Sequence, residues 1–286
     1  MSATAEFHYR LPERVSGLRP GAHAGSSQGP GMAFVGHQRL QDCPDPRRLD
    51  IRASLRDPRG DWLVRVARQR TAVPVWLIAD VSASMAFGAP SKLEVVAELA
   101  AAIGRSAFRA GDAAGLIAFD RGERADCYRP PSLSRGAGDR LAAPLRALAA
   151  TAQPAPDGRG VIEALQRLAG RTALVFLASD FHWPLTVMDE AWGLLRRACV
   201  VPVIVWDPAE LVPPAQDGLL RLRDVERDQQ RRLWLRPTLR RRWQQAIDER
   251  RNTLRRYFAA QGLRPFFTSG AFDAEAMSQY FLEGGP

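Results

Sequence analysis

An aspartate and two serines at two-residue intervals are the residues in this chain with the clearest potential for chemistry. Asp80, Ser82 and Ser84 come directly after the apolar run Val73-Pro-Val-Trp-Leu-Ile-Ala. One carboxylate and two hydroxyls are hard oxygen donors, which suit Mg²⁺ or Mn²⁺ rather than zinc. The same pattern also fits a structural role, in which Asp80 caps the next helix and the serines form a turn. Both interpretations are open at this point.

The apolar run before Asp80 is short and rich in β-branched and aromatic residues, which is typical of a strand buried on both faces. Its carboxylate would emerge at the carboxyl end of the strand, where open α/β sheets bind ligands. Further along, apolar runs alternate with helical patterns. We therefore expect an α/β fold with a doubly wound, mainly parallel sheet. The expected strands are 73–80, 114–120, 172–179 and 200–206, and the expected helices are 92–109, 138–150, 160–169 and 186–198.

The segments on either side of this core predict three regions, which are 1–70, 71–210 and 211–286. Residues 1 to about 38 are rich in Gly, Pro and Ser, and we expect loop-like chain that packs only through Phe7, Tyr9 or Phe34. Alternating residues at 48–55 and 61–67 flank the turn signal Asp57-Pro-Arg-Gly60 and predict a β-hairpin.

The C-terminal region predicts a second hairpin, a long helix and a final strand and helix. The hairpin arms are Leu219–Asp224 and Arg231–Leu235. Pro237 suits the first turn of a helix that runs through Ala260. The last strand and helix are expected at 264–269 and 272–282.

Composition limits the classes of protein to which the chain could belong. No apolar run approaches the roughly 18 residues that span a membrane, and the N-terminus lacks the apolar core of a signal peptide, so we expect a cytoplasmic protein without membrane contact. Three scattered cysteines indicate neither a disulfide framework nor a zinc knuckle. The net charge is +9, and residues 219–257 hold thirteen arginines against five acids. Lys92 is the only lysine.

An ordered series of motifs resembles a known family. Asp-x-Ser-x-Ser after a buried strand is similar to the metal-ion-dependent adhesion site of von Willebrand factor type A domains, which bind partners through the ion, with a carboxylate of the partner completing its coordination. The whole series resembles the bacterial and archaeal family catalogued as domain of unknown function fifty-eight, over roughly residues 25–205. Its members are commonly encoded beside MoxR-type AAA+ ATPases. The motifs are Gly29-x-Gly31-x-x-Phe34, Arg48-Leu-Asp50-Ile-Arg52-x-Ser54, Val64-Arg65, Asp80-x-Ser-x-Ser-Met85 and Gly111-Asp112-x-x-Gly115.

The resemblance implies that an aspartate after a later strand and a threonine from a second loop complete the ion site. Asp180 matches the aspartate, but Arg159 stands where the family has threonine. Either Asp157 replaces the missing oxygen ligand, or the Arg159 guanidinium takes the place of the cation and pairs with both aspartates. Trp183, which we expect at the rim of the site, and Arg159 are the candidates for partner contacts, and His182 suggests only a packing or surface residue.

Three functions compete. The motif series and the lack of a complete catalytic set favour a non-enzymatic adaptor or assembly chaperone that acts on a client with a MoxR-type ATPase. A metal-dependent hydrolase is a second hypothesis, although Gly-x-Ser-x-Gly, His-Glu-x-x-His and phosphate-loop motifs are absent. Nucleic-acid binding by the arginine-rich segment with Trp234, Trp243 and Tyr257 is the third. We expect the first, with Mg²⁺ or Mn²⁺ held by Asp80, Ser82, Ser84, Asp180 and Asp157.

Overall fold

The structure is a computed structural model, and it describes residues 5–11, 20–29, 33–148, 153–224, 226 and 229–285. The chain divides into two compact units. One comprises Met1–Pro12 with Pro74–Pro286, and the other comprises Glu13–Val73. No helix among the described residues is both long enough and apolar enough to cross a membrane.

The larger unit is built on a six-stranded sheet with the strand order β11-β8-β7-β4-β5-β6. Every neighbouring pair is parallel except β5 with β6, so the predicted mainly parallel α/β sheet is confirmed. The edge strand β6 was not predicted, because two of its four residues are prolines. The strands are β4 (Val75–Asp80), β5 (Ala114–Phe119), β6 (Arg129–Ser132), β7 (Ala173–Ser179), β8 (Ala198–Trp206) and β11 (Phe266–Ser269).

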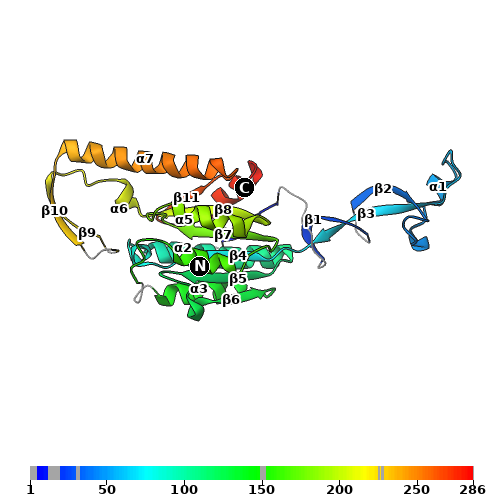
Figure 1. The fold of residues 1–286 in the computed structure, drawn as a ribbon, viewed down its shortest axis with the longest axis horizontal. Coiled ribbons are helices and arrows are strands. Elements are labelled where there is room, and N and C mark those ends of the chain that lie inside the picture. Colours follow the sequence, from blue (N-terminus) through cyan, green and yellow to red (C-terminus); the bar gives the residue numbers. More distant parts are fainter. Residues whose placement is uncertain are drawn as a thin grey trace. The chain divides into compact units, whose positions relative to one another are not determined.

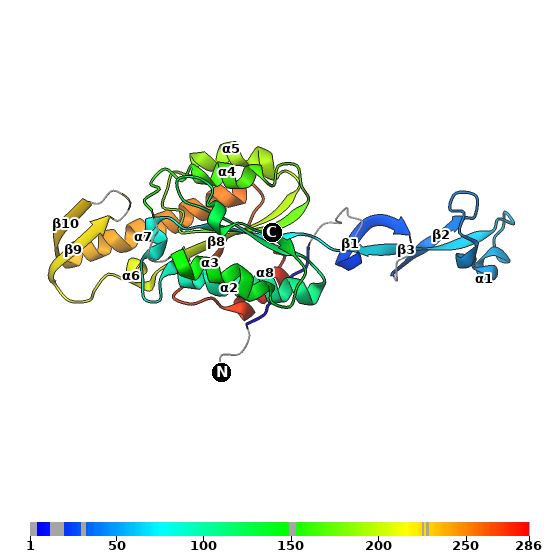
Figure 2. The ribbon, with the colours of Figure 1, turned by 90° about the horizontal axis from the view of Figure 1, so that it is seen from below.

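Helices cover both faces of this sheet, with α4 and α5 on one face and α2, α3 and α8 on the other (Figure 2). On the first face, Ile78 and Leu177 pack with α4, α5 and the C-terminal part of α7. On the second, Phe176 contacts Phe281 of α8 and the buried Phe7, which confirms that Phe7 packs. The helices of this core are α2 (Lys92–Ala110), α3 (Ala137–Leu148), α4 (Gly160–Gln166), α5 (Thr186–Ala191) and α8 (Ala274–Leu282), with 3-10 turns η2 (Ala83–Ala86), η3 (Ala125–Cys127) and η4 (Trp192–Leu195).

The helix boundaries differ from the prediction by a few residues. The helix expected at 160–169 ends at Gln166, and the one expected at 186–198 is α5 followed by η4, which ends at Leu195. The last two residues of the helix expected at 138–150 lie outside the described residues.

The C-terminal part of this unit follows the prediction closely. The short helix α6 (Pro208–Leu211) leads to a hairpin of β9 (Gly218–Asp224) and β10 (Gln229–Leu235), and α7 (Pro237–Ala260) follows (Figure 1). Only Leu254 and Phe258 of α7 are buried. The register pairs Leu219 with Trp234.

The smaller unit corrects the predicted N-terminal hairpin. Its sheet has the order β1-β3-β2 and is antiparallel, with β1 (Pro20–Gly29), β2 (Ala33–Arg39) and β3 (Leu63–Thr71). The expected first arm at 48–55 instead holds a 3-10 turn, η1 (Pro46–Arg48), and a helical turn, α1 (Ile51–Ser54). Asp50 caps α1 by accepting a hydrogen bond from the Ala53 amide, which offers the backbone an alternative to pairing as a strand.

Phe34 also departs from the prediction that it packs, because it is 52% exposed. It lies in β2, inside a segment that was expected to be loop-like. The glycine and proline content of this segment suggested a loop. In the structure Pro20 and Gly29 are instead the first and last residues of strand β1.

Candidate functional site

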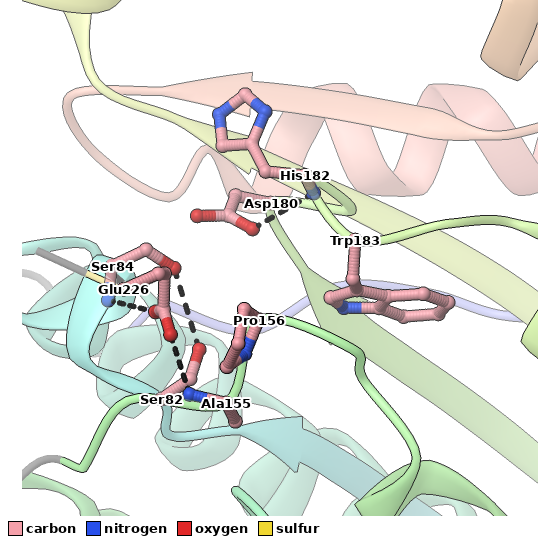
Figure 3. Close-up of a pocket in the computed structure, with 8 residues that line it drawn as sticks. All are labelled: Ser82, Ser84, Ala155, Pro156, Asp180, His182, Trp183 and Glu226. Atoms are coloured by element: carbon pink, nitrogen blue, oxygen red, sulfur yellow. Dashed lines mark hydrogen bonds between the residues drawn. The ribbon is translucent and has the colours of Figure 1, made fainter. Parts of the chain in front are cut away.

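A pocket of about 130 Å³ opens where β4 and β7 end (Figure 3). These two strands are neighbours and parallel, so their carboxyl ends meet at one edge of the sheet. The structure thus brings three of the predicted ion-site residues, Ser82, Ser84 and Asp180, to one pocket, with Asp80 buried beneath it. The lining residues are Ser82, Ser84, Ala155, Pro156, Asp180, His182, Trp183 and Glu226.

Asp80, the last residue of β4, is 1% exposed, and both of its carboxylate oxygens accept hydrogen bonds. One oxygen accepts a hydrogen bond from the Ser82 amide at 3.0 Å. The other accepts from the Ser179 hydroxyl at 2.6 Å and the Trp183 indole N–H at 3.2 Å. The Ser82 and Ser84 hydroxyls lie 3.3 Å apart. This network fixes the Asp-x-Ser-x-Ser turn in one conformation.

Asp180, which follows β7, is paired with Lys92, the first residue of α2. The ammonium lies 2.7 Å from a carboxylate oxygen of Asp180 and 2.8 Å from Glu210 of α6. The Lys92 and Asp180 side chains are each only 1% exposed. The cation paired with the second aspartate is therefore Lys92, which the sequence-based prediction did not include.

The two aspartates differ in their affinity for a proton. Burial, followed by the charge of Asp180, raises the pKa of Asp80 to about 6. Burial also acts to raise the pKa of Asp180, but Lys92 and then His182 outweigh it and bring that pKa to about 2. Asp80 and Asp180 together hold more negative charge than Lys92 neutralises, which favours a further cation nearby.

The predicted ligands of the second loop do not enter the pocket, although Ala155 and Pro156 just before them line it. The side chains of Asp157 and Arg159 are exposed, and neither residue lines the pocket. Asp157 accepts a hydrogen bond from the amide of Arg159 at 3.2 Å, a local turn that keeps both on the surface. Neither of the two predicted outcomes, Asp157 as a ligand or Arg159 as the cation, is the arrangement seen.

Trp183 also departs from its predicted place at the rim. Its side chain is 4% exposed, and its indole N–H donates to Ser179 and Asp80. The ring lies against Gly158 so closely that a Cβ there would stand 2.5 Å from the indole. Trp183 therefore holds Asp80 in position and offers little surface to a partner. His182 stacks on Trp206 and lines the pocket.

Gly158→Ala is expected to disturb this contact more than the same change at Gly170. Both glycines have positive φ, 65° and 68°, so alanine costs roughly 1–2 kcal/mol of backbone strain at either site. No atom lies within 4 Å of a Cβ at Gly170. At Gly158 the clash with the buried indole should cost about 1–3 kcal/mol more. Urea unfolding of both variants measures the difference, and equal losses would contradict the packing described for Trp183.

Glu226, between β9 and β10, is a lining residue that the sequence did not indicate. Its carboxylate accepts hydrogen bonds from the Ser84 amide at 2.7 Å and the Ala155 amide at 2.5 Å (Figure 3). Nothing in the local sequence of a hairpin turn predicts a contact across 142 residues. Lys92 did carry a signal, because it is the only lysine among forty basic residues.

The donor chemistry of the pocket fits a hard divalent cation. Among the described residues, no three His, Cys, Asp or Glu side chains are grouped so that they alone could hold a metal ion. The pocket instead combines the Ser82 and Ser84 hydroxyls with the carboxylates of Asp180 and Glu226. Oxygen donors with surplus negative charge are the set that Mg²⁺ prefers.

Of the comparisons with known proteins, the family profile identifies a family, and none identifies an activity. The sequence profile described as "Protein of unknown function DUF58" matches residues 40–253. Uncharacterised proteins of Mycobacterium bovis and Mycobacterium tuberculosis are 28% identical over 246 residues, which is 84% of this chain and 75% of theirs.

Solved structures resemble the chain only distantly. The conserved hypothetical protein BatB of Bacteroides thetaiotaomicron aligns with a TM-score of 0.43 at 15% identity, covering 74% of this chain and 98% of that one. An aerotolerance-related membrane protein of Bacteroides fragilis aligns with a TM-score of 0.40 at 12% identity, with the same coverage. At such TM-scores neither resemblance bears on function.

Proposed function

This chain belongs to the DUF58 family, and from that premise we propose that it is a non-enzymatic protein-interaction module. Its partners are a MoxR-type AAA+ ATPase and a client protein, and it acts in the cytoplasm as an adaptor or assembly chaperone. The ATPase hydrolyses the nucleotide, and this chain presents the client through the pocket at the carboxyl edge of its sheet. We also propose a von Willebrand factor A-like fold for the larger unit, because its Asp-x-Ser-x-Ser motif resembles the adhesion site of those domains.

The observation that carries this proposal is the meeting of Asp80, Ser82, Ser84 and Asp180 at one edge of the sheet. Their spacing in sequence resembles an adhesion site, and the described pocket collects the same side chains with Asp80 beneath them. A pocket of about 130 Å³ is small for a metabolite, since ligand pockets usually measure about 300–1,000 Å³. It is large enough to receive one side chain of a partner.

Mg²⁺ is the ion that we assign to this pocket. The Ser82 and Ser84 hydroxyls would hold it, with Asp80 and Asp180 supplying the negative charge. When bound, the ion would neutralise that charge and offer a coordination position to an oxygen of a partner. The residues of this chain orient the donors, since Ser179 and Trp183 fix Asp80 and Lys92 fixes Asp180.

Calorimetric titration of EDTA-treated protein with Mg²⁺ is expected to give saturable binding that the double change Ser82→Ala and Ser84→Ala abolishes. Both changes remove oxygen donors without leaving a buried charge unpaired. Arg159→Thr is the matched control and should bind like the wild type, because Arg159 is exposed and outside the pocket. Equal binding by the double alanine variant would contradict the assignment, as would gained binding in Arg159→Thr.

Co-purification tests the function itself. The tagged full chain, expressed in its own host, is expected to capture a MoxR-type ATPase, and the double alanine variant is expected to capture much less. Mass spectrometry of the bound fraction identifies the ATPase. Absence of any AAA+ protein, in a host that encodes one, would contradict the proposal.

The arginine-rich segment does not favour nucleic acid as a second candidate. Two of its three aromatic residues are engaged within the chain, since Trp243 donates to the Glu210 carbonyl and Tyr257 donates to Asp189. Arg250 donates to the Phe181 and Trp183 carbonyls, and Arg240 pairs with Asp217. The segment uses much of its hydrogen-bonding capacity to attach α7 and the hairpin.

A further inference from the structure

One face of the β9–β10 hairpin is left uncovered by the described part of the chain. Side chains of a strand alternate between two faces, and residues paired across an antiparallel hairpin share a face. The inner face carries leucines that are partly or fully buried, which are Leu220, Leu222, Leu233 and Leu235. In the half of the hairpin that leads into α7, the opposite side carries four exposed residues, here called the outer face, which are Leu219, Arg221, Arg232 and Trp234. In Figures 1 and 2 the hairpin lies outside the six-stranded sheet and the helices that cover it.

The outer face has an apolar half. Leu219 and Trp234 are directly opposite each other and are 59% and 60% exposed. An antiparallel sheet with one face in water normally carries polar residues on that face. Adjacent exposed apolar side chains rimmed by charge are typical of interaction surfaces, and tryptophan is enriched among the residues that dominate binding energy at interfaces. This pair therefore indicates a docking surface.

The other half of the outer face holds two positive charges side by side. Arg221 and Arg232 are also directly opposite each other, and like charges in that arrangement destabilise a strand pair. Among the described residues, neither guanidinium has a hydrogen-bond or ion-pair partner. The surrounding segment 219–257 holds thirteen arginines against five acids, so it supplies few carboxylates of its own. An anionic partner would remove the repulsion and use the donors of both arginines.

We propose that the outer face of the hairpin binds an acidic segment of a partner protein. Carboxylates of that segment contact Arg221 and Arg232, and an apolar side chain next to them in its sequence covers Leu219 and Trp234. None of these four residues lines the pocket at Ser82 and Ser84. The inference therefore goes beyond the proposed function, because this surface needs neither the ion nor the ATPase.

Charge and composition favour this occupant over two others that an arginine-rich face suggests. A second copy of the chain is disfavoured because each copy carries a net charge of +9. Single-stranded nucleic acid binds by stacking successive bases on aromatic side chains, and Trp234 is the one aromatic residue among the four of the outer face. Leu219 beside it suits an apolar side chain of a protein.

Fluorescence anisotropy of a labelled acidic peptide, titrated with the full chain in EDTA, tests the proposal. The peptide is fluorescein-Asp-Glu-Leu-Asp-Glu-Phe-Asp-Glu-amide, and EDTA prevents its carboxylates from binding through an ion. We expect saturable binding that weakens with added salt and falls roughly tenfold in Trp234→Ala and in the double change Arg221→Glu and Arg232→Glu. The analogue with Asn and Gln in place of Asp and Glu should not bind. No binding of the acidic peptide, or equal binding of its analogue, would overturn the proposal.

Two matched controls separate a local contact from overall charge and hydrophobicity. The double change Arg196→Glu and Arg197→Glu alters the net charge by the same amount at two exposed arginines that follow η4. Trp62→Ala removes an indole of similar exposure, 57%, from the smaller unit. Both proteins should bind the peptide like the wild type. Losses equal to those of the hairpin variants would overturn the assignment to the outer face.

The single change Arg221→Glu tests whether weaker binding comes from unfolding. It places opposite charges at directly paired positions, which should stabilise the strand pair while it removes one contact for a carboxylate. We therefore expect weaker peptide binding together with a urea midpoint no lower than that of the wild type. Undiminished binding by this variant would overturn the proposal.

Three further measurements distinguish the other occupants and the ion pocket. Labelled oligothymidylate should bind more weakly than the peptide, and tighter binding that Trp234→Ala abolishes would overturn the proposal in favour of nucleic acid. A dimer in sedimentation velocity that Trp234→Ala dissociates would overturn it in favour of a second copy. The double change Ser82→Ala and Ser84→Ala should leave peptide binding unchanged, and a loss there would place the peptide at the ion pocket and overturn the proposal.

Discussion

Lys92→Met is expected to destabilise the metal-free protein by about 3–5 kcal/mol at pH 7, because it removes one partner of a buried ion pair. The Lys92 and Asp180 side chains are each 1% exposed, so the remaining carboxylate would be almost completely buried without its cation. Methionine has nearly the same length as the aliphatic part of lysine, so the loss reports the charge and not a cavity. Urea unfolding in EDTA measures it.

The pH dependence of this effect follows from the pKa of Asp180. Lys92 and His182 overcome the effect of burial and hold that pKa at about 2, below the value of about 3.9 in an unfolded chain. A depressed carboxylate pKa contributes stability that is present above pH 4 and lost as the pH falls toward 2. The difference between wild type and Lys92→Met should therefore shrink between pH 4 and pH 2.

The double change Lys92→Met and Asp180→Leu is the matched control. Replacing both charges with apolar side chains removes the fully buried carboxylate, and Glu210, the other partner of Lys92, is partly exposed, so most of the lost stability should return. A single variant as stable as the wild type at pH 7 would contradict the account of Lys92. So would a double variant that is less stable than the single one.

Trp183→Ala is expected to lower the free energy of unfolding by about 3–5 kcal/mol, the usual cost of truncating a buried aromatic residue. The ring is 4% exposed and contacts Phe181 at 5.2 Å between centroids. Its loss also removes the indole donor from Asp80. Binding of the partner should weaken as well, because Asp80 would no longer be held in place.

Trp183→Phe separates these two roles. Phenylalanine retains most of the packing and lacks the N–H group, so we expect a loss of only about 1–2 kcal/mol. Asp80 still accepts hydrogen bonds from Ser82 and Ser179 in that variant. Urea unfolding measures the free energy of unfolding of both variants. If Trp183→Ala costs less than 1 kcal/mol while partner binding falls, Trp183 would be a surface contact as the sequence first suggested.

Much of the fold could be predicted because its signals are local. An apolar run indicates the buried strand before Asp80, and Pro237 at the start and Gly262 beyond the end indicate the helix Pro237–Ala260. The segment around Ile51 could not be predicted in this way. Its alternation suggested a strand, but the Asp50 cap favours a helical turn, and Ile51 is 60% exposed.

In the candidate site too, the residues with local sequence signals could be predicted and the others could not. Asp80, Ser82 and Ser84 are close in sequence, and Asp180 follows a recognisable strand, so their meeting could be expected from a parallel sheet. Lys92 and Glu226 depend on tertiary contacts across 88 and 142 residues, which no periodicity encodes. Arg159 was predicted in the site because it aligns with the threonine of the family pattern, but its side chain is exposed.

Hydrogen–deuterium exchange of the chain, with and without its purified MoxR-type ATPase at saturating concentration, shows where on this chain the partner binds. We expect it at the pocket lined by Ser82, Ser84, Ala155, Pro156 and Asp180. Exchange at residues 81–86 and 153–158 is expected to be slower in the complex. Unchanged exchange in both segments, whether protection falls elsewhere or nowhere, would contradict this binding site.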